Sequence, residues 1–390
     1  MARKANTRAA AGNGTIRQRP DGRWEARVTV GRDPGTGRQR QRSIYGSTQK
    51  EVAEKLRALT AEIDKGTYIE PTKLTVGKWL DIWQADYLTD VKPRTAALYR
   101  STIERYILPA FGATKLEALQ AHAAQRFYNG LAKDTAHPLS AKTIKNVHGI
   151  FHKAITQAVE LGYLRFNPLD ACKLPKTVKK EIKPLDEPAI AQLIAAIKGS
   201  KFENEIFVAL FTGMREGELI GLTWDCIDFA RGTININKQL QLQAGNGYCF
   251  VSPKNGKGRV ITPAAAVMDV LRRQSRKQSA QRLAAGRAWE NLHNLVFTNE
   301  TGRNIATRTL FREYKRIVES IGHPDARFHD LRHSYAVAAL LNGDDIKTVQ
   351  ENLGHHAAAF TLDVYAHATE QMKAASAARM DAFIKGVSNL

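Results

Sequence analysis

The sequence TGMREGEL, at residues 212–219, places an arginine and a glutamate where one helix is expected to end and the next to begin. Gly213 suits the end of a helix because glycine enters the left-handed conformation at little steric cost. Arg215 is then expected to start the following helix, with Glu218 one turn further on. Taken alone, Arg215 and Glu218 would be an ordinary surface pair, so their meaning depends on the segments that accompany them.

Two segments nearer the C-terminus complete a pattern with this stretch. HDLRH occupies residues 329–333, and LGH at residues 353–355 is followed by Tyr365, ten residues after His355. The series of Arg, His-x-x-Arg, His and Tyr resembles the catalytic signature of the tyrosine recombinases, or phage integrases. The Thr-Gly-Met-Arg and Leu-Gly-His blocks are specific in combination, whereas either alone would be weak. The resemblance covers most of the chain and is to integrases of temperate phages and conjugative transposons.

The chemistry of a phosphodiester explains why these residue types belong together. A phosphodiester is an anion, and more charge builds on its non-bridging oxygens as a nucleophile attacks. Arg215 and Arg332 offer planar, permanently charged forks that can hold those oxygens without a metal. Tyr365 is the expected nucleophile, and its phenol, with a pKa of about 10, must lose its proton during the attack. Because a covalent phosphotyrosine keeps the bond energy, we expect no metal, nucleotide or other cofactor.

The resemblance also implies roles for other residues of the signature. It implies that His329 assists proton transfer from the tyrosine and that His355 donates a hydrogen bond to the phosphate. Glu218 matches the acidic position that orients the active-site arginine. In the family a lysine on a hairpin protonates the leaving 5′ oxygen. Lys254 matches that position best, and Lys257 is the alternative.

Composition indicates the class of partner. The 390 residues include 58 Lys and Arg against 38 Asp and Glu, for a net charge of +20, so an extended polyanion such as double-stranded DNA is expected. No apolar run reaches the roughly 18 residues that span a bilayer. We therefore expect no membrane association. The resemblance to integrases of phages and conjugative transposons further implies a bacterial cytoplasmic protein associated with the nucleoid. Cys172, Cys226 and Cys249 lack C-x-x-C spacing, which argues against a disulfide framework or a Cys-rich zinc site.

The N-terminal part predicts a small DNA-binding module. We expect a flexible basic arm over residues 1–13 and, over residues 14–66, a three-stranded sheet with one helix, which Thr48 caps. Strands are expected at 14–18, 24–30 and 38–45.

A two-residue period divides the faces of this sheet into an apolar one and a cationic one. Arg38, Arg40 and Arg42 share a parity, and with Arg27 they are candidate DNA contacts; the alternative is a solvated basic strand. Ile44 has the same parity as these arginines, which suggests that the strand ends or bulges before it.

Residues 72–170 read as an all-helical bundle, and residues 171–184 as a basic linker. Apolar stripes define its helices. One stripe contains Val76, Trp79, Leu80 and Trp83. Another opens at Pro93, closes at Pro109 and Gly112, and contains Leu98, Tyr99, Ile103, Tyr106 and Ile107. A further helix is expected to start at Ser140 and to end at Gly162. The linker lysines are further candidate DNA contacts: Lys173, Lys176, Lys179 and Lys180.

Residues 185–390 complete a multidomain α+β architecture, in which a mainly α catalytic domain carries a small antiparallel sheet near residues 232–262. By resemblance, residues 14–66 bind arm sites and residues 72–170 bind the core site together with this catalytic domain. A C-terminal apolar stripe is expected to pack on its own domain or on a neighbouring protomer: Met372, Ala375, Met380, Phe383, Ile384 and Val387.

The resemblance implies a site-specific recombinase that works as a homotetramer through a Holliday junction, with accessory directionality or DNA-bending proteins as possible partners. Other classes remain open. His329 and His333 have the i, i+4 spacing of a zinc-protease helix, but Asp330 stands where such a helix needs glutamate and Arg332 would repel a metal. A catalytically silent DNA-binding architectural protein and a type IB topoisomerase are the remaining alternatives. The basic N-terminal module favours recombination over relaxation.

Overall fold

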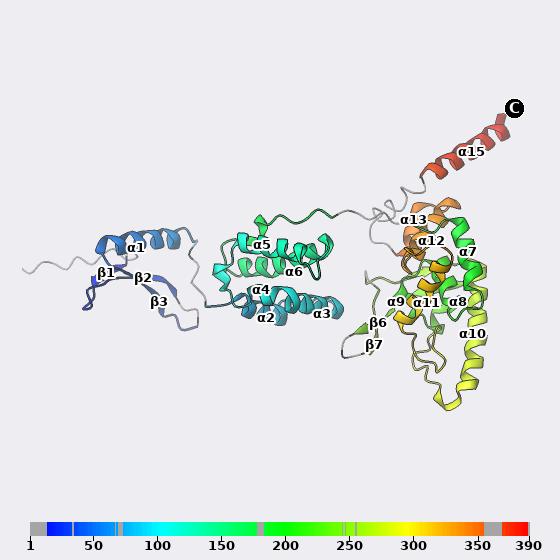
Figure 1. The fold of residues 1–390 in the computed structure, drawn as a ribbon, viewed down its shortest axis with the longest axis horizontal. Coiled ribbons are helices and arrows are strands. Elements are labelled where there is room, and N and C mark those ends of the chain that lie inside the picture. The colour runs from blue at the N-terminus through cyan, green and yellow to red at the C-terminus, as the bar shows by residue number, and fades with distance from the viewer. Residues whose placement is uncertain are drawn as a thin grey trace, which may run out of the picture. The chain divides into compact units, whose positions relative to one another are not determined.

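The computed structural model divides into two compact units, Met1–Val178 and Lys179–Leu390 (Figure 1). The structure describes residues 14–32, 35–66, 68, 73–177, 183–243, 245, 247–253, 256–354 and 369–388. Five of the predicted site residues lie outside this described part: Lys179, Lys180, Lys254, His355 and Tyr365. The expected N-terminal arm, residues 1–13, also lies outside it.

The first unit opens with the expected sheet and helix. Strands β1 (Thr15–Gln18), β2 (Trp24–Arg32) and β3 (Gln39–Gly46) form an antiparallel sheet in the order β1-β2-β3, and α1 (Gln49–Asp64) packs on it. The Thr48 side chain accepts a hydrogen bond from the Glu51 backbone N–H, so the predicted N-cap is confirmed. Together the sheet and the helix bury a small apolar core: Ala26, Val28, Val52, Leu56 and Leu59.

The arginine series of β3 lies differently from the expectation. The strand continues through Ile44, and the irregularity is in β2, where the pairing shifts between Thr29 and Gly31. Arg42 pairs with Val28, which is only 3% exposed, so Arg42 and Ile44 are on the face that the helix covers. The prediction that Arg42 belongs to a cationic face opposite the apolar one was wrong. Burial of Ile44 sets the register, and Arg42 instead stacks 5.8 Å from the ring of Tyr68.

The rest of the first unit is a helical bundle around one core. Its elements are α2 (Val76–Asp86), α3 (Pro93–Thr102), η1 (Ile103–Ile107), α4 (Leu108–Phe111), η2 (Leu116–Ala118), α5 (Ala121–Lys133), α6 (Ala141–Glu160) and η3 (Pro168–Ala171). Ser140 caps α6 as predicted, by accepting from the Thr143 backbone N–H. The Trp79 indole donates to the Ala154 carbonyl at 2.8 Å, which ties α2 to α6.

Two details of the bundle differ from the sequence-based expectation. Leu98 is 59% exposed rather than part of the buried stripe. Pro109 does not close the helical path, because it lies in the first turn of α4, where proline costs no hydrogen bond. Gly112, the other predicted closing residue, is confirmed as the C-cap. The stripe of α2 is confirmed, since all four of its apolar side chains are at most 1% exposed: Val76, Trp79, Leu80 and Trp83.

The second unit is mainly helical with small sheets, and it contains one large apolar core and a smaller cluster between its last two packed helices. Its helices are α7 (Glu187–Ile197), α8 (Glu203–Thr212), α9 (Glu216–Ile220), α10 (Ala265–Ala285), α11 (Thr307–Ser320), α12 (Asp330–Leu341), α13 (Ile346–Leu353) and α15 (Thr369–Ser388), with short turns η4 (Trp224–Cys226) and η5 (Gly286–Ala288). One sheet has the order β4-β5-β8 and contains β4 (Ile227–Asp228), β5 (Thr233–Ile236) and β8 (Arg259–Ile261); the other pairs β6 (Gln239–Gln243) with β7 (Gly247–Val251). The sequence predicted one small antiparallel sheet near residues 232–262, whereas the structure has two. The second sheet was missed because strands this short contain too few residues to show a two-residue period.

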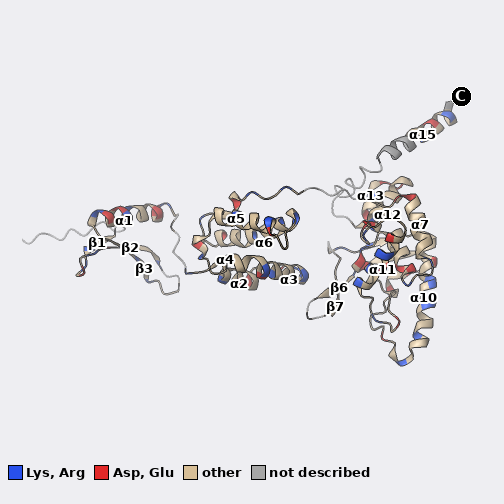
Figure 2. Ribbon diagram, viewed as in Figure 1, with Lys and Arg blue, Asp and Glu red and all other residues tan. Residues whose placement is uncertain are grey.

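Both units carry basic side chains (Figure 2), and the C-terminal helix has exposed apolar side chains. Figure 2 shows lysines and arginines on elements of both units, α6 and α10 among them. Among the described residues, no helix is both long enough and apolar enough to cross a membrane. The predicted C-terminal helix forms α15, where Met380, Phe383 and Val387 are each more than half exposed. Whether this stripe packs in its own protomer or on a neighbour stays a prediction.

Candidate active site

The junction between α8 and α9 is built around Gly213. Its φ of 61° is left-handed, and a Cβ there would come within 2.6 Å of side-chain atoms of both Leu353 and Tyr335, so only glycine fits. Arg215 is the N-cap of α9, and its backbone N–H donates to the Glu218 carboxylate at 2.9 Å. The predicted helix end, helix start and one-turn spacing are therefore all confirmed.

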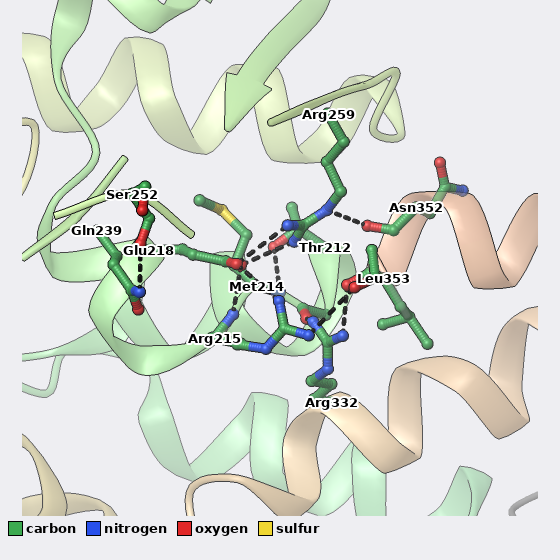
Figure 3. A network of polar contacts seen from close by, with 12 residues as sticks. Thr212, Met214, Arg215, Glu218, Gln239, Ser252, Arg259, Arg332, Asn352 and Leu353 are labelled. Atoms are coloured by element: carbon green, nitrogen blue, oxygen red, sulfur yellow. Dashed lines mark hydrogen bonds and ion pairs between the residues drawn. The ribbon is translucent and has the colours of Figure 1, made fainter. Parts of the chain in front are cut away.

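The buried carboxylate of Glu218 binds two arginines, Arg215 and Arg259 (Figure 3). The Glu218 side chain is 0% exposed and accepts from Arg215 Nη1 at 2.9 Å. Arg259, at the start of β8, donates to both carboxylate oxygens of Glu218, from Nη1 at 3.0 Å and from Nη2 at 2.7 Å. Burial alone would raise the pKa of Glu218, but hydrogen bonds and charge from Arg259, and then from Arg215, hold that pKa at about 2. Glu218 is therefore an anion at neutral pH.

Arg332 reaches the same place from α12. It is 3% exposed, and its guanidinium donates to the Gly213 carbonyl at 2.6 Å and to the Leu353 carbonyl. Burial, followed by the charge of Arg215, lowers the pKa of Arg332 to about 9, which still leaves it protonated at neutral pH. Arg215 Nη2 donates to the Gly354 carbonyl at 3.2 Å, so both arginines meet at the C-terminal end of α13 (Figure 3).

The arginine cluster, which consists of Arg215, Arg259 and Arg332 with Glu218, is cationic, because it contains three guanidinium groups and one carboxylate. Arg215 and Arg259 contact that carboxylate, whereas Arg332 donates to backbone carbonyls. Side-chain exposure differs within it: Arg215 is 19% exposed and Arg259 only 9%. Positive charge held by fixed carbonyls and a buried carboxylate is arranged to receive an anion with several oxygens. Among these side chains, Arg215 is the more accessible to such an anion.

His329 stands directly before α12, one turn from Arg332. Burial, followed by the charge of Arg332, lowers the pKa of His329, so it is neutral at pH 7 and can accept a proton. Its ring lies 5.3 Å from the ring of His333, whose pKa burial lowers to about 4. Arg327 pairs with Asp330 beside them at 2.8 Å. Within the described ranges, no group of three or more His, Cys, Asp or Glu side chains is placed to hold a metal ion.

The structure thus brings together Arg215, Glu218 and Arg332, which the sequence singled out, with His329 three residues before Arg332. Lys254, His355 and Tyr365 are outside the described residues, although Gly354, immediately before His355, belongs to the site. Arg259 was missed. It ends the cationic run GKGR at residues 256–259, and nothing local distinguishes an arginine that folds inward from its exposed neighbours.

The predicted DNA contacts of the first unit are less uniform than expected. Arg27 Nε donates to Glu25 at 3.0 Å, and Glu25, only 2% exposed, also pairs with Arg17 at 2.6 Å. Arg27 nevertheless remains 47% exposed, so part of its cationic surface is accessible. Lys173, Lys176, Arg38 and Arg40 are exposed residues.

Comparison with known protein families identifies two matching segments. Residues 183–372 match the model of the phage integrase family, and residues 75–132 match that of the phage integrase N-terminal SAM-like domain. A tyrosine recombinase XerC-like protein of Caldanaerobacter subterraneus is 29% identical over 90% of this chain and 93% of its own length. The tyrosine recombinase XerC of Lactobacillus delbrueckii is 30% identical over 57% of this chain and 69% of its own.

Solved structures with a similar fold extend the comparison. The integrase of transposon Tn1549, in complex with a circular intermediate DNA, superposes with a TM-score of 0.67 at 22% identity, over 79% of this chain and all of that one. A lambda integrase tetramer bound to a Holliday junction gives a TM-score of 0.53 at 18% identity, over 91% of this chain and 96% of that one. Most of both units therefore follows one known architecture.

Proposed function

The chain belongs to the phage integrase family and is a tyrosine recombinase of the mobile-element integrase type, and from this premise we propose a role for each residue of its signature. Tyr365 attacks a phosphodiester of double-stranded DNA. A bond forms between its phenolic oxygen and phosphorus, and the bond from phosphorus to the 5′ oxygen breaks. The products are a 3′-phosphotyrosyl link and a strand that ends in a 5′-hydroxyl.

The convergence of Arg215 and Arg332 on one point carries this proposal. In the turn that precedes His355, the Gly354 carbonyl accepts from Arg215 at 3.2 Å and the Leu353 carbonyl accepts from Arg332. Arg332 also donates to the Gly213 carbonyl at 2.6 Å. A phosphate bound there would meet fixed cations as charge builds on its non-bridging oxygens. His355 would add a hydrogen bond to the same group.

Two protons must move for the strand to be cut. His329, whose pKa is lowered by burial, is neutral and can take the phenolic proton. Lys254 gives a proton to the leaving 5′ oxygen, with Lys257 as the alternative. Rejoining reverses both transfers when a 5′-hydroxyl from the partner strand attacks the phosphotyrosine.

We further propose that four protomers exchange strands through a Holliday junction, as in the lambda integrase assembly with a similar fold. Residues 14–66 would bind arm sites, while residues 72–170 and 185–390 would enclose the core site. The lysines of residues 171–184 would lie along the DNA backbone. Accessory directionality or DNA-bending proteins would assist this strand exchange. The reaction would take place in the bacterial cytoplasm, on the DNA of the nucleoid.

The direct test is a search for a covalent adduct. The full chain would be incubated, in EDTA, with a nicked duplex taken from the DNA that flanks its own gene. We expect an SDS-resistant protein–DNA adduct that disappears in Tyr365→Phe. DNA binding without an adduct across all flanking sites would contradict the proposal and favour an architectural protein. Relaxation of supercoils without exchange between sites would favour a topoisomerase.

A modified substrate separates the two candidate acids. If sulfur replaces the bridging 5′ oxygen, the leaving group is a thiol, which departs without prior protonation because its pKa is about 8.5. We expect this substrate to rescue Lys254→Ala while Lys257→Ala needs no rescue. Rescue of Lys257→Ala alone would reassign the acid to Lys257.

A further inference from the structure

Arg259 belongs to no part of the signature, yet its side chain donates to both oxygens of Glu218 and to the Asn352 carbonyl. We propose that Arg259 is a positioning residue, which keeps Arg215 directed at the scissile phosphate by occupying Glu218 and by fixing the end of α13. The proposal rests on the proposed function, since it concerns the same phosphate. It adds a residue to the machinery without giving that residue a direct contact with DNA.

The geometry of Arg259 is that of a clamp between distant segments. β8 pairs with β5, with Arg259 opposite Ile236, so its backbone is part of a sheet. Its guanidinium takes both oxygens of Glu218, and its Nε donates to the Asn352 carbonyl at 2.6 Å (Figure 3). One planar side chain therefore joins β8, α9 and α13, and each N–H group it uses has a defined acceptor.

How Glu218 is shared decides what Arg215 can do. A carboxylate prefers a bidentate arginine, and here Arg259 holds that position. Arg215 is left with a single side-chain contact to Glu218, from Nη1, and turns Nη2 to the Gly354 carbonyl. Without Arg259, Glu218 would accept Arg215 in the bidentate mode. The guanidinium of Arg215 would then turn toward the carboxylate, its charge compensated, and away from an incoming phosphate.

The same side chain also fixes the turn that supplies carbonyls to the other two arginines. Asn352, whose carbonyl Arg259 binds, directly precedes Leu353 and Gly354, whose carbonyls accept from Arg332 and Arg215. Gly354 has a left-handed φ of 62°, and a Cβ there would lie 3.1 Å from the Arg259 side chain. Arg259 thus packs directly against the turn that leads into His355.

The test compares rates on two substrates in the full chain. We would measure adduct formation at saturating DNA for wild type, Arg259→Met and Arg259→Lys. The scissile phosphate would be either a normal phosphodiester or a methylphosphonate, which lacks the negative charge. Arg316→Met is the matched control, because Arg316 on α11 also holds a glutamate through two N–H groups but has a side chain that is 68% exposed.

We expect Arg259→Met to lower the rate on the normal substrate by about 100-fold, the scale of a misplaced catalytic group. DNA affinity should change by less than about threefold, since Arg259 makes no phosphate contact. On the methylphosphonate the deficit should shrink to under about tenfold, because an uncharged phosphorus centre depends less on aligned cations. Arg259→Lys keeps the charge but not the fork, so it should lose about tenfold. Arg316→Met should match wild type.

Several results would overturn the inference. One is a wild-type rate in Arg259→Met. Another is an equal loss of rate on both substrates in Arg259→Met together with a lowered melting temperature, which would make Arg259 a purely structural residue. If Arg259→Met fails to fold, Arg259→Lys allows the same comparison of the two substrates. A loss confined to DNA affinity would make it a binding residue. If wild type itself forms no adduct, the proposed function fails, and this inference fails with it.

Discussion

Two glutamates of the second unit are equally buried and behave in opposite ways. Glu218 on α9 is 1% exposed and Glu205 on α8 is 3% exposed. Two arginines hold the pKa of Glu218 at about 2 against the effect of burial, whereas burial raises the pKa of Glu205 to about 7. Within the part of the chain that the structure describes, Oε2 of Glu205 has no hydrogen-bond partner.

The difference between them shows that partners, and not burial, decide what a buried carboxylate does. Glu218 stays charged and distributes that charge between Arg215 and Arg259. Glu205 has only the distant charges of Lys277 and Lys201 to offset its desolvation. Its ionisation therefore costs stability near neutral pH, while the ionisation of Glu218 supports the cluster.

The largest effect is expected at Arg332, the most buried arginine of the arginine cluster. Arg332→Ala removes a buried cation that two carbonyls hold, and adduct formation should fall at least about 1000-fold, the scale of a lost oxyanion donor. DNA affinity should fall far less. The slope of log affinity against log salt concentration should decrease by at most the amount that corresponds to about one lost phosphate contact. Quench-flow cleavage and filter binding measure the two effects. Loss of binding with an unchanged cleavage rate would reverse the assignment.

The next effect removes the shared anion itself. Glu218→Gln leaves Arg215 and Arg259 without their counter-charge, and breaking a buried pair costs about 3 to 5 kcal/mol of unfolding free energy. Chemical denaturation would measure it. The control is Glu313→Gln, which breaks a pair with exposed Arg316 and should cost less than about 1 kcal/mol. Equal losses in the two variants would contradict the distinction between a buried ion pair and an exposed one.

A smaller effect of opposite sign is expected at Glu205, whose Oε2 has no hydrogen-bond partner within the described residues. Because the pKa of Glu205 rises from 4.5 to about 7 on folding, the folded state binds more protons between those values, so wild-type stability falls as pH rises through that window. Glu205→Gln does not titrate and should be more stable than wild type by up to about 3 kcal/mol at pH 8. At pH 4.5 the two should coincide. Denaturation at both pH values would test this, and a pH-independent difference would contradict it.

The smallest effect should come from Glu25, a third buried carboxylate, in the N-terminal sheet. It is paired like Glu218, and its pKa is held at about 2 by hydrogen bonds from Arg17 and then Arg27. Those arginines are 59% and 47% exposed, so water and salt screen them. Glu25→Gln should lower the hydrogen-exchange protection of β1 and β2 amides slightly, and 1 M salt should abolish the difference. A salt-resistant loss would show that exposure of the partners does not matter.

Local sequence signals were sufficient wherever a structure depends on neighbouring residues. Thr48 and Ser140 start their helices as predicted, because a cap involves only the next three residues. The same local view was wrong for Leu98 and Arg42. Whether Leu98 is covered depends on which helix lies opposite, and the face of Arg42 depends on a register set by Val28 and Ile44.

At the candidate active site, the sequence by itself determined the types and spacing of the signature residues and the glycine that ends α8. It could not determine how they are held. Arg259 meets Glu218 across 41 residues, and Arg332 meets the Gly213 carbonyl across 119. A helix period relates residues up to four positions apart, whereas contacts at such separations exist only once the core has packed. Only the tertiary structure therefore decided that Glu218 has two arginines and that Oε2 of Glu205 is without a partner among the described residues.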